Sequence, residues 1–232
     1  MKHIILDAGG VLVYPRLGEW HIPYRAAEIL GPERAATMKT EAFRAAHAAC
    51  MHWLDESRPV PDMDFERLLR RGFVLELDRA MGWRMTDAEI AAMTDDFTDD
   101  MDRYGFFDDL LPWFERWSRR YTLSLLSDAM PSILKFLDDY GLGKYFAQAV
   151  ISTHVEATKP SPRMYAEALR RLNADPADCL FVDDRRCNVE GAVDAGMVAA
   201  QMSRPEFPAD ALWDGPVVHN FSELNDLLEA LR

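Results

Sequence analysis

Short apolar runs alternate with helical patterns along most of the chain, and polar residues follow several of these runs. The first run is Ile4–Leu6, and Asp7 with two glycines follows it at once. The later runs are Tyr121–Leu126, Ala149–Ile151, Leu180–Val182, Val198–Met202 and Val217–Val218. Continuous apolar strands that alternate with helices are typical of a parallel sheet covered on both faces. The pattern therefore predicts an α/β core.

Helical spacing fills the gaps between these strands. Ser161 is a suitable N-cap, and Pro162 fits the first helical position of a segment that runs to Leu172. Gly196 is expected to stop another helix at its C-terminus. The other predicted helices of the core are Leu110–Arg119, a segment opened by Pro131, Asn188–Ala195 and a last helix capped by Ser222.

The segment from Tyr14 to Tyr104 has a different pattern, with apolar residues at helical spacing and no strand signal. Thr86 and Glu89 are placed to form a capping box. The predicted helices here are Glu19–Leu30, Glu33–Leu54, Phe65–Met81 and Asp87–Tyr104. Because this block follows the first strand, we interpret it as an all-helical cap domain of residues 15–104. The core would then comprise residues 1–14 and 105–232.

Composition limits the classes of protein and partner. The chain has 232 residues, of which 49% are hydrophobic, so it has enough apolar surface for a sizeable core. Its formal net charge of −13 disfavours nucleic acid and anionic membranes as partners. Three cysteines without a CxxC pair indicate a reducing compartment. No run is long enough for a signal peptide or a membrane span. We therefore expect a cytoplasmic protein, either a monomer or a homodimer.

Polar residues stand at the ends of three predicted strands. They are Asp7, the pair Ser127–Asp128 and the pair Asp183–Asp184, and Lys159 precedes a helix start. In open parallel sheets, ligands bind beyond the carboxyl ends of the strands, so these residues are expected to converge. Clustered carboxylates repel each other unless a divalent cation joins them. Oxygen ligands close to a substrate phosphate favour Mg²⁺.

Four short motifs, in this order, resemble those of the haloacid dehalogenase-like (HAD) hydrolase superfamily. They are Asp7–Leu12, Leu125–Asp128, Lys159–Pro162 with Tyr165, and Phe181–Asp184 with Asn188 and Gly196. Each motif is weak alone, but the ordered set covers nearly the whole predicted core. The resemblance implies a Rossmann-like core and a helical cap inserted after the first motif. It further implies a phosphatase that acts on a small phosphorylated metabolite.

The resemblance also implies a role for each matching residue. Asp7 would attack phosphorus and form an aspartyl-phosphate. Ser127 and Asp128, through the hydroxyl and nearby backbone amides, would bind phosphate oxygens together with Lys159, which would neutralise charge on Asp7. The implied protein contacts of Mg²⁺ are Asp7, the carbonyl of Gly9, Asp184 and, through a water molecule, Asp183.

Gly9 departs from the pattern, because phosphatases of this superfamily usually have a general acid/base aspartate at this position. Metal-free 2-haloacid dehalogenases also lack that aspartate, so this activity is an alternative. A binding or regulatory protein that has lost its acid is a second alternative. The pair Asp183–Asp184 and Lys159 favour the metal-dependent reaction over dehalogenation.

A possible metal site in the helical block receives less weight. His47 and Cys50 could share a helical face, but His52 falls off it and no second ligand cluster follows. Packing or substrate lining explains these residues better. The same holds for the aromatic residues Trp20, Tyr24 and Trp53.

Overall fold

The computed structural model describes residues 1–17, 19–57, 59–209 and 212–231, and the chain divides into two compact units. The core unit consists of Met1–Tyr14 and Phe106–Arg232, and the helical unit consists of Pro15–Gly105. The boundary falls within two short strands, β2 (Val13–Pro15) and β3 (Tyr104–Phe106), which form a two-stranded sheet.

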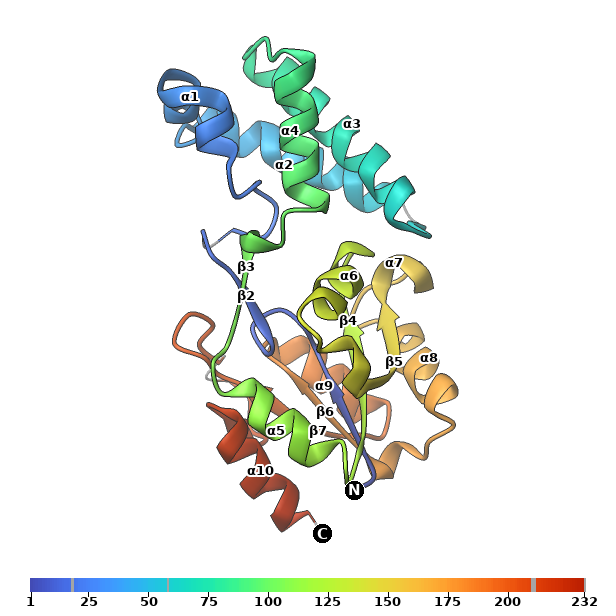
Figure 1. The fold of residues 1–232 in the computed structure, drawn as a ribbon. Coiled ribbons are helices and arrows are strands. Elements are labelled where there is room, and N and C mark those ends of the chain that lie inside the picture. Colours follow the sequence, from blue (N-terminus) through green and yellow to red (C-terminus); the bar gives the residue numbers. More distant parts are fainter. Residues whose placement is uncertain (18, 58, 210–211, 232) are drawn as a thin grey trace. The chain divides into compact units, whose positions relative to one another are not determined.

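A six-stranded parallel sheet forms the centre of the core unit (Figure 1), as the apolar runs predict. Its strands, in sheet order, are β5 (Phe146–Ile151), β4 (Thr122–Ser127), β1 (His3–Leu6), β6 (Cys179–Asp183), β7 (Val198–Met202) and β8 (Val217–Val218). The central strand β1 has three fully buried residues, Ile4–Leu6, as expected for a strand between two neighbours. Leu6 pairs with Leu125 on one side and with Val182 on the other. This register makes β1, β4 and β6 end at the same edge of the sheet.

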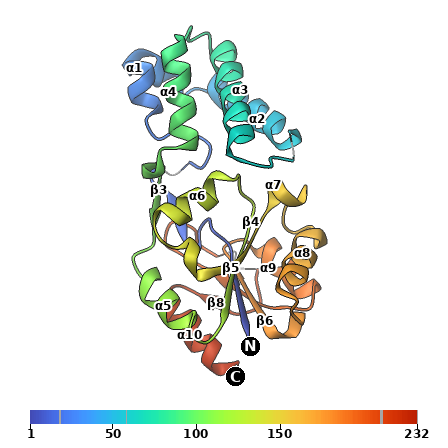
Figure 2. The ribbon, with the colours of Figure 1, turned by 45° about the vertical axis from the view of Figure 1, so that its right-hand side comes forward.

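Helices flank this sheet (Figures 1 and 2), which confirms the predicted α/β class. They are α5 (Leu110–Trp117), α6 (Ser132–Asp139), α7 (Ser152–Val155), α8 (Pro162–Leu172), α9 (Arg186–Asp194) and α10 (Phe221–Ala230), with 3₁₀ turns η2 (Gly143–Tyr145) and η3 (Pro176–Asp178). Met164 and Tyr165 of α8 and Val189 of α9 share one buried cluster with Phe181 of β6. This packing fixes the two helices whose N-termini follow Lys159 and Asp183.

The helical unit contains α1 (Ala26–Thr37), α2 (Glu41–Glu56), α3 (Met63–Met81), α4 (Asp87–Thr98) and the 3₁₀ turn η1 (Met101–Arg103). The predicted capping box is present, because the Thr86 side chain accepts from the Glu89 backbone and Glu89 accepts from the Thr86 backbone. The predicted helix over Glu19–Leu30 is wrong at its start, since α1 begins at Ala26. Gly31 kinks α1 with a φ of 72° instead of ending it. The helix ends later, at Thr37, and Thr40 caps the next helix, α2.

Two further predictions are wrong at element ends. The helix expected to reach Tyr104 stops at Thr98, and Tyr104 lies in β3, so the segment does contain a strand. Asn220, not Ser222, caps the last helix: its side chain accepts a hydrogen bond from the Glu223 backbone at 2.9 Å. Ser222 lies one residue inside α10.

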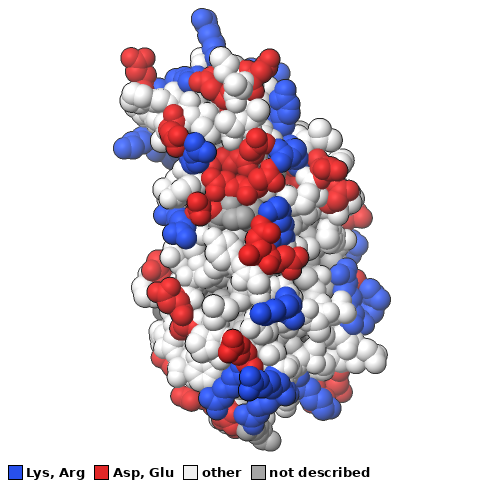
Figure 3. All heavy atoms as spheres, viewed as in Figure 1, with Lys and Arg blue, Asp and Glu red and all other residues white. Residues whose placement is uncertain are grey.

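The surface agrees with the acidic composition. Figure 3 shows acidic and basic side chains interspersed on one face, and no basic area of described residues spreads across that face.

Among the described residues, no helix has the length and apolar content needed to cross a membrane.

The capping box predicts a stability effect in the helical unit. Replacing Thr86 by Ala removes the acceptor for the Glu89 N–H, and we expect a loss of about 1 kcal/mol in the free energy of unfolding. Thr86→Ser keeps the hydroxyl and serves as the matched control. Urea unfolding followed by circular dichroism measures both variants. Equal stability of Thr86→Ala and wild type would contradict a stabilising role for this cap.

Candidate active site

Three carboxylates meet at the edge of the sheet where β1 and β6 end. Asp7 directly follows β1, Asp183 is the last residue of β6, and Asp184 follows it. One oxygen atom from each lies within 4.8 Å of the others. Since Leu6 and Val182 are paired in neighbouring parallel strands, the residues after them are brought level. The predicted convergence of the three carboxylates is therefore present in the structure.

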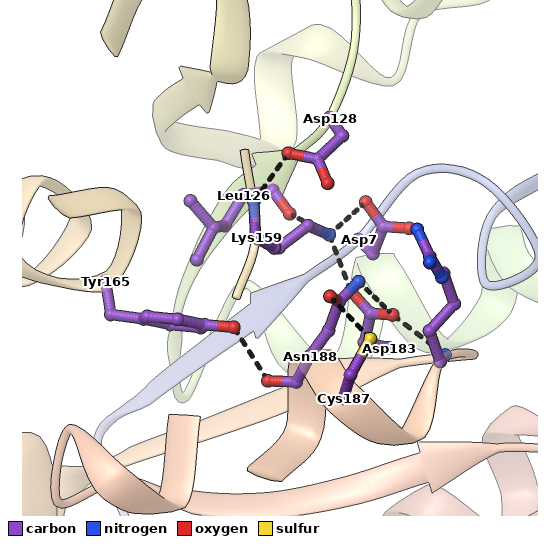
Figure 4. A network of polar contacts seen from close by, with 9 residues as sticks. Asp7, Leu126, Asp128, Lys159, Tyr165, Asp183, Cys187 and Asn188 are labelled. Carbon is purple, nitrogen blue, oxygen red and sulfur yellow. Dashed lines mark hydrogen bonds and ion pairs between the residues drawn. The ribbon is translucent and has the colours of Figure 1, made fainter. Parts of the chain in front are cut away.

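Lys159 lies among these carboxylates and is only 4% exposed. Its Nζ atom is 2.7 Å from Asp7 Oδ1 and 2.5 Å from Asp183 Oδ2, and it donates a hydrogen bond to the Leu126 carbonyl at 3.1 Å (Figure 4). The backbone N–H of Lys159 donates to Asp128 Oδ1 at 3.0 Å. The lysine thus points inward at Asp7, as the sequence predicts.

Asp183 is fully buried, and its carboxylate oxygens accept hydrogen bonds from other residues of the core unit. Besides Lys159, its oxygens accept hydrogen bonds from the Arg185 backbone at 2.9 Å and from Asn188 Nδ2 at 2.9 and 3.1 Å. Tyr165 in turn donates to the Asn188 carbonyl at 2.8 Å. These contacts tie Lys159 to the start of α9. A water-mediated contact between Asp183 and a metal remains a prediction.

Burial and mutual repulsion set the electrostatics of the site. Burial is the largest effect on Asp7 and raises its pKa to about 6. The charge of Lys159 and a hydrogen bond from Ser127 act in the opposite direction and lower the pKa. Burial, followed by the charges of Asp7 and Asp183, raises the pKa of Asp184 to about 8. For Lys159, burial lowers the pKa, but Asp183 and Asp7 outweigh burial and raise it overall. One ammonium therefore does not compensate the three carboxylates.

This donor set fits a divalent cation. Three carboxylate oxygens close together, with incomplete charge compensation, are the hard ligands that Mg²⁺ prefers. Gly10 allows the loop after β1 to approach the Asp184 carboxylate closely. Its φ is +70°, and a Cβ at this position would lie only 2.6 Å from Asp184 Oδ2. Gly9 lies in the same loop, where it forms an isolated bridge with Val13. Ligation by the Gly9 carbonyl remains a prediction.

The remaining predicted residues lie at the same edge of the sheet, with one difference in expected contacts. Ser127 is buried at the end of β4 next to Asp7. Asp128 positions the Lys159 backbone through its carboxylate, so phosphate binding at Asp128 would have to come from its amide. Sequence reasoning gave no role to Asn188, although its place in the fourth motif was visible. It also missed Gln201, whose Nε2 donates to the Asp184 carbonyl at 2.7 Å and which no motif marked.

The histidines and cysteine of the helical unit do not form a metal-ligating group among the residues described. His47 Nε2 lies 2.9 Å from the His21 carbonyl oxygen, and Cys50 is buried. His52 is exposed beside Glu56 at 3.4 Å. Packing and surface contacts account for all three.

Comparison with known proteins identifies the class of protein. A family model described as haloacid dehalogenase-like hydrolase matches residues 1–196. The chain therefore belongs to the haloacid dehalogenase-like hydrolase family, in agreement with the motifs and the fold.

Individual relatives match this chain over only part of its length or at low sequence identity. The glyceraldehyde 3-phosphate phosphatase of Methanopyrus kandleri is 35% identical over 68 residues, which is 29% of this chain and 29% of that protein. Matches to curated relatives span only 24 to 46% of the lengths of those relatives. A 2-haloacid dehalogenase from Pseudomonas syringae pv. Tomato DC3000 has a similar fold, with a TM-score of 0.70 and 23% identity over 100% of both chains. A HAD phosphatase from Thermococcus onnurineus has a TM-score of 0.65 and 18% identity over 98% of both chains.

The raised pKa values predict a pH-dependent response to Mg²⁺. Between about pH 4 and 8 the folded protein keeps a proton on Asp184 that the unfolded chain has released, and between about pH 4 and 6 it also keeps one on Asp7. In EDTA, these two groups should therefore lower the stability as pH rises through this range. Mg²⁺ binds the ionised forms, so it should raise Tm more at pH 8 than at pH 6.

Differential scanning fluorimetry with MgCl₂ or EDTA at both pH values measures this effect. Asp184→Asn is the control, because it removes the group with the highest raised pKa and should reduce the Mg²⁺ response at both pH values. A Tm increase that is equal at the two pH values, or equal in the variant, would contradict the predicted cation site.

Proposed function

We propose that this protein is a Mg²⁺-dependent phosphatase that hydrolyses small phosphate monoesters through an aspartyl-phosphate on Asp7. The observation that carries the proposal is the position of Asp7 between a buried ammonium and two further carboxylates. Such a site can accept a phosphoryl group only if positive charge compensates both the nucleophile and the phosphate. Lys159 supplies one such charge, and a bound cation would supply the rest.

The first half of the reaction uses Asp7 as the nucleophile. One carboxylate oxygen forms a bond to phosphorus while the bond from phosphorus to the ester oxygen breaks, and the alcohol leaves with the electron pair. Lys159, held by Asp183 and Leu126, stays beside Asp7 and offsets negative charge during the transfer. Ser127, whose side chain contacts Asp7, would donate a hydrogen bond to a phosphate oxygen. Asp7, Asp184 and the Gly9 carbonyl would hold Mg²⁺, which would supply positive charge that offsets the negative charge of the phosphoryl oxygens.

The second half restores the enzyme. Water attacks phosphorus, the bond from phosphorus to Asp7 breaks, and inorganic phosphate leaves. The departing alcohol needs a proton in the first half, and the attacking water must lose one in the second. Gly9 cannot exchange either proton, although an aspartate usually does so at this position in family phosphatases.

Dehalogenation is the rival reading. Its support is Gly9, and structures of haloacid dehalogenases share this fold, but below 25% identity they inform only on the fold. The carboxylate pair at the end of β6 favours phosphatase chemistry, since a metal-free halide displacement gains nothing from uncompensated carboxylates beside its nucleophile. The phosphatase name of the relative from Methanopyrus kandleri also supports the proposal. We further propose a cytoplasmic protein, monomeric or homodimeric, whose substrate is a small phosphorylated metabolite.

Replacing the nucleophile tests the proposal. Asp7→Asn should lower kcat on any phosphate ester by roughly 10³-fold or more, because an amide attacks phosphorus poorly. The exposed Asp226 on α10 provides the matched control, and Asp226→Asn should keep wild-type activity. Circular dichroism confirms that both variants fold. Substantial turnover by Asp7→Asn would exclude Asp7 as the nucleophile.

The missing acid predicts a preference for stable leaving groups. A positioned acid contributes about 10²–10⁴-fold in rate, so wild type should hydrolyse aryl or anomeric phosphates much faster than primary alkyl phosphates. Gly9→Asp should accelerate the alkyl phosphates most, whereas Gly9→Asn should not. The measurement is kcat/KM across leaving groups of graded pKa for all three proteins. If wild-type kcat/KM does not vary with leaving-group pKa, another residue donates the proton.

A further inference from the structure

Gln201 is the one polar residue of the buried strand β7, which otherwise contains valine, alanine and methionine. Its side chain is only 1% exposed. Burying an amide is costly unless hydrogen bonds satisfy it, and the Gln201 Oε1 atom has no hydrogen-bond partner among the described residues. A strand covered on both faces favours an apolar residue at such a position. A polar residue there points to a role other than stability.

The Gln201 side chain holds the backbone of Asp184. Its Nε2 atom donates a hydrogen bond to the Asp184 carbonyl at 2.7 Å. The pairing of β6 with β7 ends at Asp183 and Gln201, so Asp184 is the first residue beyond it. The Gln201 backbone is itself fixed, because its N–H donates to the Pro216 carbonyl at 2.9 Å, next to β8. The side chain therefore extends the contact between β6 and β7 by one residue.

The Asp184 carboxylate is also confined by the loop after β1. A Cβ at Gly10 would lie only 2.6 Å from Asp184 Oδ2, so the backbone of this loop is close to the carboxylate. Lys159 contacts the other two carboxylates, those of Asp7 and Asp183. Mg²⁺ requires near-ideal octahedral geometry, whereas Ca²⁺ accepts more flexible ligand sets. A loosened Asp184 would therefore weaken the binding of Mg²⁺ more than that of Ca²⁺.

We infer that Gln201 is a positioning residue, which holds Asp184 in place for a divalent cation and gives the site a preference for Mg²⁺ over Ca²⁺. The inference rests on the metal site of the proposed function. Gln201 acts through the Asp184 backbone, as the hydrogen-bond partner of a metal ligand. Loss of such a partner typically lowers metal affinity by about 10- to 100-fold.

Replacing Gln201 by methionine tests the inference, because methionine has a similar length and volume but removes the donor to Asp184. Calorimetric titration without substrate measures Kd for MgCl₂ and for CaCl₂. Gln201→Met should raise the Kd of Mg²⁺ by roughly tenfold and that of Ca²⁺ much less. The matched control is Gln148→Met on β5, at the edge of the sheet, and it should keep both Kd values.

The ratio of the two Kd values separates positioning from a general loss of structure. Partial unfolding removes sites for both cations and leaves this ratio unchanged. Circular dichroism shows whether Gln201→Met folds. If it does not, Gln201→Asn takes its place with the same expected result, because its amide is one methylene shorter and loses contact with Asp184.

Binding of Mg²⁺ that is selectively weakened in the variant supports the inference even if no phosphate ester is hydrolysed, an outcome that would reject only the phosphatase. An unchanged Kd for Mg²⁺, or equal weakening for both cations, would overturn the role of Gln201 and leave the proposed phosphatase intact. A wild-type protein that binds no Mg²⁺ would overturn both the cation site and this inference.

Discussion

The ion pairs of Lys159 with Asp7 and Asp183 are the interaction on which the site depends. A buried ammonium is stable only where carboxylates and hydrogen-bond acceptors surround it, and here Asp7, Asp183 and the Leu126 carbonyl do so. Each of these groups comes from a different strand end. The contact therefore joins β1, β4 and β6 to the loop before α8, and it holds Asp7 in one position.

The charge balance at this point also determines what the site can bind. The ammonium is shared between Asp7 and Asp183, and Asp183 is further occupied by Asn188 and the Arg185 backbone. Within the described part of the chain, no lysine or arginine forms an ion pair with Asp184, and the pKa of its carboxyl is raised to about 8. The protein thus presents a partly compensated anionic site, which a divalent cation would complete. With the cation bound, a phosphate can approach a nucleophile that would otherwise repel it.

Much of this arrangement could be predicted from the sequence. The apolar runs before Asp7, Ser127 and Asp183 are unambiguous strands, and parallel strands must deliver the following residues to one edge. Lys159 could be placed because a proline and a helix start follow it directly. Local pattern was insufficient where a distant partner decided the outcome. Tyr104 lies in a strand because β2 pairs with β3, and Gln201 contacts Asp184 through the adjacency of β6 and β7, which the sequence does not mark.

The group that transfers protons in the proposed reaction follows neither from the sequence nor from the fold. In the proposed phosphoryl transfer, the carboxylates, Lys159 and Ser127 would supply the nucleophile, the charge and the hydrogen bonds, while Gly9 has no acidic side chain. In the proposed reaction, the phosphoryl group is transferred to Asp7 before it reaches water.

Trapping the intermediate tests this claim most directly. In a single-turnover reaction with an aryl phosphate, acid quenching preserves an acyl phosphate, and borohydride then reduces that group to an alcohol. Peptide mass spectrometry should find homoserine in place of aspartate at position 7, only in samples that received substrate. An unmodified Asp7 during turnover, or reduction at Asp183 or Asp184 instead, would contradict the account.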